Sequence, residues 1–318
     1  MDYPEFFKEW HNPRNYIIVH TSGSTGKPKE IKLQKNFVAA SANRTIKFFD
    51  IKAHYRLHSC VSPDFIGGKM MAVRAELAGC GLTWETPSNR PFQELSSDDN
   101  IHLAALVPSQ MEYVVNNLSK IPKIDNYIVG GAPVSDSLRI KIASNGLNAY
   151  ETYGMTETAS HIALRKITVE EKPFNTLEGI SVSLNESGCL VINFESGENF
   201  VTNDLGILIS PTQFYISGRA DHIINTGGRK VNPFDIEKKL EKIINSPFVI
   251  TSLKDDKWGE RIILVVEGTK NTVDSLTIEN GCKSLLEPWQ RPKEIRFIEK
   301  LPRTPNGKIS RDRTCYFF

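Results

Sequence analysis

The chain has 318 residues, of which 40% are hydrophobic and 24% are charged, and its formal net charge is +2. This composition is typical of a globular protein of about two domains, and the small charge gives no indication of a nucleic-acid or anionic-membrane partner. No apolar run reaches the ~18 residues of a membrane span, and the first residues are neither basic nor apolar, so the sequence predicts a cytoplasmic protein.

Short apolar runs alternate with amphipathic stretches in the first half of the chain, a pattern that predicts α/β layers. The expected strands are Tyr16–Val19, Ile101–Val107 and Tyr127–Val129. The expected helices are Asn36–Phe49, Lys69–Ala78, Gln110–Leu118 and Asp136–Ala143. From Ile180 to Tyr215, short β-rich pieces are separated by turn signals, which predicts a small, largely β subdomain.

The sequence places a domain boundary at Ser217–Asp221. After it we expect a helix over Phe234–Ile244 and strands over Phe248–Leu253, Arg261–Glu267 and Pro292–Ile298. The hypothesis is therefore a large domain over residues 1–220 and a mobile α+β C-terminal domain over residues 221–318, which is a plausible domain size.

Five cysteines are scattered along the chain, at positions 60, 80, 189, 282 and 315. None belongs to a C-x-x-C pair, and none joins a histidine cluster at zinc spacing, so the sequence does not predict a structural metal.

A dense run of hydroxyls, glycines and lysines follows the first expected strand. It comprises Thr21, Ser22, Gly23, Ser24, Thr25, Gly26, Lys27, Pro28 and Lys29. Glycine lets backbone N–H groups approach an anion, hydroxyls donate hydrogen bonds and lysine neutralises charge, so the run suits a polyphosphate. Its spacing matches neither a Walker A loop nor a dinucleotide fingerprint, and a flexible Gly/Ser turn is the alternative.

Three further motifs follow in order: Tyr153–Glu157 (YGMTE), Gly218–Asp221 (GRAD) and Leu301–Arg311 (LPRTPNGKISR). With the phosphate-like run, they resemble the adenylate-forming superfamily of acyl- and aryl-CoA synthetases over almost the whole chain. The stretch Tyr153–His161 is most similar to the o-succinylbenzoate–CoA ligases of menaquinone biosynthesis. The resemblance implies the adenylate-forming fold, ATP and Mg²⁺ as requirements, and CoA and a small carboxylic acid as co-substrates.

The resemblance also implies roles for individual residues. Residues 21–26 and Lys29 would hold the β- and γ-phosphates, Thr156 the α-phosphate and Glu157 the Mg²⁺ ion. Gly131, Ala132 and Tyr153 would contact adenine, and Asp204 and Arg219 the ribose. Lys308 would be the adenylation lysine, Asp221 the hinge, and Gly227 and Gly228 the border of the CoA tunnel.

Several of these residues also have an ordinary structural interpretation. Thr156 and Glu157 suit a helix N-terminus, and Tyr153 suits a core. Asp204 suits a solvated turn, and Gly227-Gly228 a surface turn. Asn203 stands where the family usually has glycine.

The sequence says least about the acid. A dicarboxylate such as o-succinylbenzoate needs an anchor for its second carboxylate. The candidates are Ser160, His161, Arg165, Lys69 and Arg74, each of which could equally have a structural role.

The resulting hypothesis is an ATP-dependent acid–CoA ligase that acts through an acyl-adenylate. Only about 20 residues precede the phosphate-like run, which is fewer than in full-length relatives. This shortness keeps open a non-catalytic nucleotide-binding homologue. Another aryl- or acyl-CoA ligase, or a carrier-protein-loading enzyme, is the alternative within the class.

Overall fold

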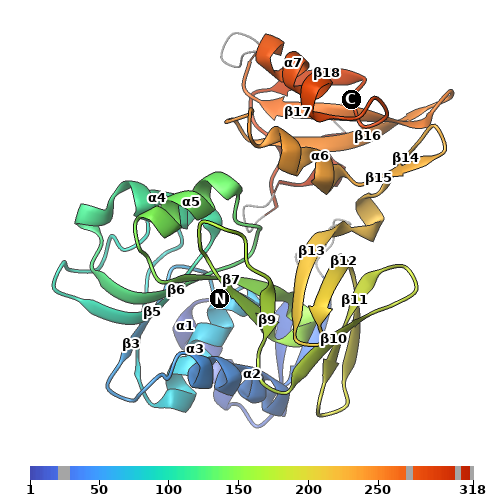
Figure 1. Ribbon diagram of the computed structural model, residues 1–318. Helices are drawn as coiled ribbons and strands as arrows, with labels where there is room; N and C mark the ends of the chain where they lie inside the picture. Colours follow the sequence, from blue (N-terminus) through green and yellow to red (C-terminus); the bar gives the residue numbers. More distant parts are fainter. Residues whose placement is uncertain (21–28, 270–274, 305–308, 316–318) are drawn as a thin grey trace. The chain divides into compact units, whose positions relative to one another are not determined.

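The computed structural model of the chain describes residues 1–20, 29–269, 275–304 and 309–315 (Figure 1). They form two compact units. The first contains Met1–Val182, Asn193–Phe200 and Ile209–Phe214, and the second contains Ser183–Ile192, Val201–Leu208 and Tyr215–Phe318. A domain boundary between residues 220 and 221 stays a prediction.

Parallel strands form the centre of the first unit, as the alternating pattern predicted. In sheet order these are β4 (Gly81–Trp84), β3 (Arg56–Ser59), β5 (Asn100–Leu106), β6 (Lys123–Val129) and β7 (Ala149–Met155). Strands β8 (Ser160–Lys166) and β9 (Phe174–Thr176) continue this sheet with antiparallel pairing. The path then runs through β13 (Gln213–Arg219), β12 (Asn199–Ser210), β11 (Cys189–Phe194) and β10 (Ile180–Leu184), so the β-rich segment is confirmed.

Helices cover both faces of the parallel strands. Helices α2 (Lys35–Phe48) and α3 (Ile66–Ala78) lie on one face, and α4 (Pro108–Asn116) and α5 (Asp136–Ser144) lie on the other (Figure 1). The short helix η1 (Leu118–Lys120) follows α4. Met111 and Leu138 pack with strand residues in one hydrophobic cluster, while Val38 and Val73 belong to another. This two-sided burial explains why β5 is apolar apart from its exposed first residue, Asn100, and the half-buried His102.

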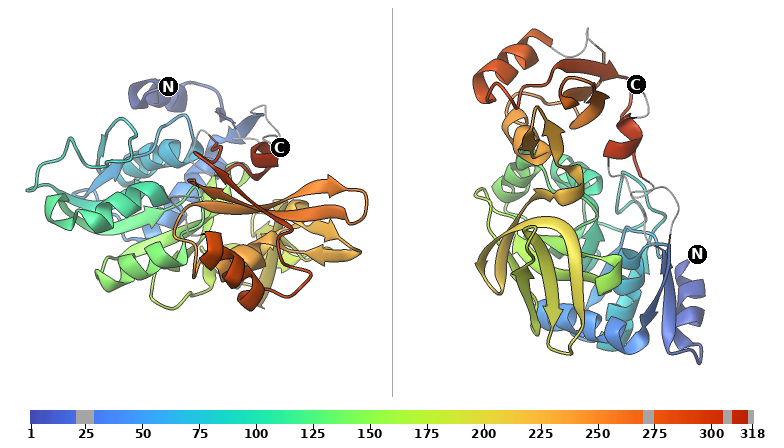
Figure 2. Two further views of the ribbon diagram at one scale, coloured as in Figure 1. Left: turned by 90° about the horizontal axis from the view of Figure 1, so that it is seen from above. Right: turned by 90° about the vertical axis from the view of Figure 1, so that its right-hand side faces the viewer.

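Helix α1 (Tyr3–His11) and the strand pair β1 (Tyr16–His20) and β2 (Glu30–Gln34) lie side by side (Figure 2). The sequence analysis missed α1. Its start carries a capping box, in which Asp2 accepts from the Glu5 N–H at 2.8 Å and Glu5 accepts from the Asp2 N–H at 3.3 Å. A carboxylate three residues after an N-cap aspartate is the signal that could have revealed the helix.

The second unit contains a smaller sheet in the order β15 (Arg229–Val231), β14 (Ile224–Thr226), β17 (Gly259–Glu267) and β16 (Phe248–Asp255). Strand β18 (Glu294–Ile298) pairs in parallel with β17. Its helices are η3 (Ala220–His222), α6 (Pro233–Leu240), α7 (Ser275–Leu285) and α8 (Arg311–Cys315). The predicted α+β character is therefore confirmed.

The helix expected over Phe234–Ile244 is α6, which ends four residues earlier, at Leu240. The N–H groups of Ile243 and Ile244 both donate to the Leu240 carbonyl, so the chain turns there. Both isoleucines still pack against the core of the second unit, which is why the apolar spacing continued past the end of the helix. Within the described residues, no helix combines the length and apolarity needed to cross a membrane.

A buried ion pair ties α1 to α3. Lys69 is 2% exposed, and its Nζ lies 3.2 Å from Glu9 Oε2 and 4.7 Å from the centre of the Phe6 ring. The other Glu9 oxygen accepts from the Ile18 N–H at 2.7 Å. Glu9 thus joins the first helix, the first strand and α3.

Removing the negative charge alone should destabilise this unit. The variant Glu9→Gln keeps an acceptor for Ile18 but leaves the Lys69 charge buried without its partner, at a cost of about 3 kcal/mol in urea unfolding. The double variant Glu9→Gln/Lys69→Met should recover most of that loss. An equal loss in both variants would contradict the pairing.

Candidate functional site

The ends of β6 and β7 place the predicted adenine-contacting residues together. These strands are parallel, with Val129 opposite Glu151, so Gly130 and Gly131 follow beside Thr152 and Tyr153. A Cβ on Gly130 would lie 2.3 Å from Thr152 Oγ1 and would displace that hydroxyl, and Gly131 has φ +86°, a backbone conformation that favours glycine. The carboxyl ends of parallel strands are a usual place for a ligand site.

A buried glutamate that the sequence analysis missed holds this turn. Glu151 Oε1 accepts from the Val134 N–H at 3.1 Å, and its Oε2 lies 2.8 Å from the Arg165 guanidinium. Burial raises the pKa of Glu151, and Arg165 opposes that shift. Glu151 therefore fixes the chain after Gly131-Ala132 and also engages one of the acid-anchor candidates.

Tyr153 is half-buried and belongs to an aromatic group. Its ring centre lies 5.3 Å from that of Phe214 and 5.8 Å from that of Phe174. Both the core interpretation and the adenine interpretation therefore fit the same side chain, because packing on one side leaves part of the ring exposed.

Thr156 and Glu157 lie on the single turn η2 (Thr156–Thr158) directly after β7. The structural alternative was an ordinary helix capped by Thr156, but the turn is a 3-10 turn whose N-cap position is Met155. In the part of the chain that the structure describes, the half-buried Glu157 carboxylate has no ion-pair or hydrogen-bond partner. It is available to a hard cation, which prefers such oxygens.

The backbone after η2 is strained. Ala159 and Ser160 have φ angles of +51° and +83°, in the left-handed region that disfavours residues with a side chain. Ser41 Oγ of α2 donates to the Ala159 carbonyl at 2.8 Å, and a Cβ on Gly154 would lie 2.2 Å from the Ser160 carbonyl oxygen. The hydrogen bond from Ser41 and the close approach of Gly154 therefore hold the strained backbone from two sides.

His161 follows this turn and points to the same helix. Its Nε2 lies 2.9 Å from Thr45 Oγ1, and its ring is buried. Burial, and secondly the charge of Arg74, lower the pKa of His161 well below its ordinary value. The imidazole is therefore neutral near pH 7 and cannot supply the cation for a carboxylate. The signal that the sequence analysis missed is the pair of hydroxyls, Ser41 and Thr45, four residues apart on α2.

Of the other acid-anchor candidates, two already have counter-charges. Lys69 pairs with Glu9, and Arg165 pairs with both Glu151 and Glu171, the latter at 2.6 Å. Although burial would lower the pKa of Arg165, these two glutamates raise it.

Arg74 differs from them. It lies on α3, is 1% exposed, and its Nη1 donates to the Met71 sulfur at 3.6 Å. Its Nε and Nη2 have no hydrogen-bond acceptor among the described residues. Burial alone lowers the pKa of Arg74, to about 9, so the side chain is still a cation near pH 7.

The predicted ribose residues and the predicted hinge residue form one network in the second unit. Arg219 Nη1 lies 3.1 Å from Asp204 Oδ1, and its Nη2 lies 2.7 Å from Asp221 Oδ2. Although burial would raise the pKa of Asp221, its hydrogen bonds with Arg219 lower it. The arginine thereby links the two aspartates that the sequence assigned to different roles.

Gly227 and Gly228 form the two-residue turn between β14 and β15, in which Thr226 pairs with Arg229. Their φ angles are +55° and +75°, and a Cβ on Gly227 would lie 2.9 Å from the Trp258 ring. Two successive positive φ angles define a type I′ hairpin, which accounts for both glycines without a tunnel. The tunnel role stays a prediction.

Several predicted residues lie outside the described part of the chain. These are Thr21, Ser22, Gly23, Ser24, Thr25, Gly26 and Lys308. Lys29 is the first described residue after the gap and leads directly into β2. Arg303 and Ile309, on either side of residues 305–308, form an isolated antiparallel bridge.

The family model described as "AMP-binding enzyme" matches residues 6–209, and the model of its C-terminal domain matches residues 248–308. The chain belongs to the AMP-binding enzyme family. It is similar to the 2-succinylbenzoate–CoA ligase of Listeria monocytogenes, with 26% identity over 98% of this chain and 72% of that relative.

Solved structures agree on the fold. The acyl-CoA synthetase (AMP-forming)/AMP-acid ligase II-like protein of Dyadobacter fermentans is 30% identical over 98% of this chain and 92% of its own, with a TM-score of 0.63. The o-succinylbenzoate coenzyme A synthetase (MenE) of Bacillus subtilis in complex with ATP and magnesium is 19% identical over 93% of this chain and 69% of its own, with a TM-score of 0.79. The predicted adenylate-forming fold is confirmed.

The strained turn generates a stability prediction. In Ser160→Gly the φ of +83° becomes unstrained, so the free energy of unfolding should stay unchanged or rise by up to about 1 kcal/mol. In the matched control Ser181→Gly, within β10, the free energy of unfolding should fall by about 1 kcal/mol. Glycine loses more conformational entropy on folding, and no backbone strain is relieved there. Equal losses in urea denaturation would show that Ser160 is not strained.

Proposed function

We propose that this chain is an AMP-forming acid–CoA ligase that converts o-succinylbenzoate to its CoA thioester. Three features support the proposal: membership of the AMP-binding enzyme family, similarity to the Listeria monocytogenes ligase, and a buried cation suited to a second carboxylate. The buried cation is the observation that favours a dicarboxylic acid as the substrate.

The proposed reaction has two steps. First, a carboxylate oxygen attacks the α-phosphorus of ATP, the bond to the bridging oxygen breaks, and pyrophosphate leaves. Second, the CoA thiol loses its proton and attacks the acyl carbon, and AMP leaves. The first step brings two anions together, so fixed positive charge must stabilise the transition state. By their positions in the motifs, Lys29 would supply positive charge at the β- and γ-phosphates, and Lys308 would supply it at the α-phosphate during the attack.

Glu157 would hold Mg²⁺, because its carboxylate is half-buried, has no other partner among the described residues and offers the hard oxygen ligand that this ion prefers. When bound, Mg²⁺ would supply charge neutralisation on the phosphates. Thr156 presents its hydroxyl on the same turn, from which it would reach the α-phosphate.

In this proposal the Asp204 carboxylate accepts hydrogen bonds from the ribose hydroxyls, and Arg219 Nη1 lies 3.1 Å from Asp204 Oδ1. Gly131, Ala132 and Tyr153 present a turn without bulky side chains and a partly exposed ring to the adenine. Asp221 would be the hinge of the C-terminal domain, and Gly227 and Gly228 would border the path of CoA.

Arg74 is the proposed anchor of the second carboxylate. A buried charge without a partner is costly, by several kcal/mol, so its retention calls for a ligand that supplies the anion. The fork of a guanidinium matches a carboxylate, and the unpartnered Nε and Nη2 are two such donors. Lys69 and Arg165 have their own carboxylates and the imidazole of His161 is neutral, so Arg74 is the candidate best suited to the role.

The kinetic consequence is selective. Arg74→Met should raise KM for o-succinylbenzoate by about 10- to 100-fold, because a charged hydrogen-bonded contact is lost. The KM for the analogue that lacks the ring carboxylate should change little. Thermal stability should not fall, because an apolar side chain replaces an unpaired charge.

The control is Arg56→Met, which removes an arginine that pairs with Asp99 elsewhere in the unit. Its KM values should match those of the unmodified protein. An equal rise in KM for both acids in Arg74→Met would remove Arg74 from the acid site.

The magnesium role of Glu157 is tested by titration. Glu157→Gln should lower turnover by about tenfold or more and raise the Mg²⁺ concentration needed for half-maximal rate, because a charged ligand is lost. Glu170→Gln, at an exposed carboxylate, is the control. Unchanged magnesium dependence in Glu157→Gln would refute the assignment.

Lys308 should matter in one half-reaction only. Lys308→Ala should slow adenylate formation by about 100- to 1,000-fold, the usual scale for a lost electrostatic contact in a transition state. Conversion of supplied acyl-adenylate and CoA to thioester should be preserved, and Lys300→Ala should affect neither step. Equal losses in both steps would contradict a role confined to adenylation.

The function itself is tested by a panel of acids assayed for pyrophosphate release, with and without CoA. Release that requires o-succinylbenzoate, followed by thioester formation with CoA, supports the proposal. Preference for another acid would favour a different acyl- or aryl-CoA ligase, and thioester formed only on a carrier protein would favour a loading enzyme. No release with any acid would favour the non-catalytic homologue.

A further inference from the structure

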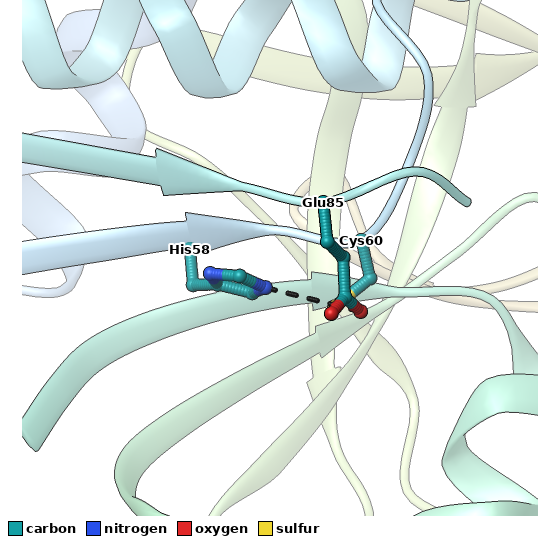
Figure 3. A group of neighbouring side chains, drawn as sticks. All are labelled: His58, Cys60 and Glu85. Carbon is teal, nitrogen blue, oxygen red and sulfur yellow. Dashed lines mark ion pairs between the residues drawn. The ribbon is translucent and has the colours of Figure 1, made fainter. Parts of the chain in front are cut away.

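His58, Cys60 and Glu85 form a buried group at the ends of two neighbouring strands (Figure 3). Strands β3 and β4 are parallel, with His58 opposite Thr83 and Ser59 opposite Trp84. One step further along, Cys60 and Glu85 face the same side as His58, because side chains alternate along a strand. The exposed fractions of the three residues are 0%, 0% and 6%, and their ligand atoms lie within 4.8 Å of one another.

Hydrogen bonding fixes which nitrogen of His58 carries its proton. Thr83 Oγ1 donates its only proton to the Leu57 carbonyl at 3.3 Å, so it must accept from His58 Nδ1 at 2.9 Å. In the neutral ring, Nε2 is then an acceptor with a free lone pair. It is fully buried and has no hydrogen-bond partner in the described part of the chain.

That lone pair faces another acceptor. Glu85 Oε1 lies 4.0 Å from His58 Nε2, and the two carboxylate oxygens accept from the N–H groups of Phe92 at 2.7 Å and Gln93 at 3.1 Å. These N–H donors favour the charged carboxylate. A buried imidazole lone pair and a carboxylate repel each other, and a proton or a metal ion between them turns that repulsion into attraction.

We propose that His58 Nε2, Cys60 Sγ and a carboxylate oxygen of Glu85 bind one Zn²⁺ ion. Nitrogen, sulfur and carboxylate oxygen are the ligands that zinc takes in proteins, and a ligating histidine usually donates its other N–H to a fixed acceptor, here Thr83. Binding would release the Cys60 proton to solvent, and thiolate plus carboxylate would then balance the two positive charges of the ion.

The proposed ion has a structural role. It ties the end of β3 to the end of β4 and, through Glu85, to the backbone at Phe92 and Gln93. Three protein ligands leave one position of a tetrahedral zinc for a small ligand such as water. The three proposed ligands include none of the residues proposed to bind the acid, ATP or Mg²⁺, so this inference does not depend on the proposed function.

The test uses the full chain, stripped of metal by a chelator and titrated with Co²⁺, whose bonds to thiolate give a sulfur-to-metal charge-transfer band in the near ultraviolet. We expect that band to saturate at about one Co²⁺ per chain and to disappear on addition of Zn²⁺, as for a single N/S/O site. A magnesium site built on oxygens gives no such band. Absence of the band from the unmodified chain would overturn the proposal and leave a thiol that shares its proton with Glu85.

Variants assign the ligands. Cys60→Ser and His58→Gln should abolish the band, and Cys189→Ser, at a buried cysteine outside the group, should keep it. Because a core variant can fail to fold, Cys60 is also followed in the unmodified chain by its alkylation under partly denaturing conditions. Zn²⁺ should slow that alkylation at least tenfold and leave the rate at Cys189 unchanged. Equal rates at Cys60 with and without Zn²⁺, or an intact band in Cys60→Ser, would refute the site.

Discussion

The proposed choice of acid depends on one buried cation, Arg74, which has no counter-charge among the described residues. Arg74 is held inside the first unit by α3, and two of its nitrogens have no acceptor among the described residues. Desolvation of a guanidinium is too costly to be incidental, and the unit contains two comparable side chains, Lys69 and Arg165, that are each paired with glutamate. That difference in pairing is the reason why Arg74 is the proposed anchor of an anionic group.

The segment between β7 and β8 connects this cation with the predicted phosphate chemistry. Thr156 and Glu157 lie on its tight turn, and two residues in the left-handed conformation follow. His161, the second residue of β8, comes next and lies close enough to Arg74 for that charge to lower its pKa. Ser41 and Thr45 on α2 hold the far side of the turn through hydrogen bonds. A displacement of this turn would therefore move Glu157, the proposed Mg²⁺ ligand, and would also change the surroundings of Arg74, the proposed acid anchor.

Neutral His161 completes this arrangement. Its buried imidazole adds no second positive charge beside Arg74, and its contact with Thr45 keeps the ring in place. A protonated ring at this position would raise the electrostatic cost of the unliganded site, whereas a neutral ring leaves Arg74 as the source of positive charge there. Burial, rather than a specific partner, is the main cause of this neutrality.

The sequence predicted what depends on local pattern. The strands at Tyr16, Ile101 and Tyr127 and the helices α2 to α5 follow from apolar periodicity. Family motifs supplied Thr156, Glu157, Asp204 and Arg219 as candidate site residues, and their roles stay predictions. Residue pairing could not be predicted. Arg74 ranks above Lys69 as the carboxylate anchor because Lys69 already pairs with Glu9, and the sequence does not show a pairing across 60 residues.

The group of His58, Cys60 and Glu85 could not be predicted either, because it depends on how two strands pair. His58 and Cys60 are separated from Glu85 by a helix and a strand, and only the parallel register of β3 and β4 brings them together. Glu151 was missed for a similar reason, because its partners Val134 and Arg165 come from two other segments. For Gly227 and Gly228 the motif is visible in the sequence but its meaning is not unique. A type I′ turn explains both glycines as fully as a CoA path does.

The most direct test of the central claim is a crystal structure of the protein with a non-hydrolysable mimic of the o-succinylbenzoyl-adenylate. The account predicts that the ring carboxylate lies within about 3 Å of Arg74 Nε or Nη2, the distance of a charge-assisted hydrogen bond. A ring carboxylate that instead contacts Lys69 or Arg165, or that points to solvent while Arg74 stays unpartnered, would contradict it.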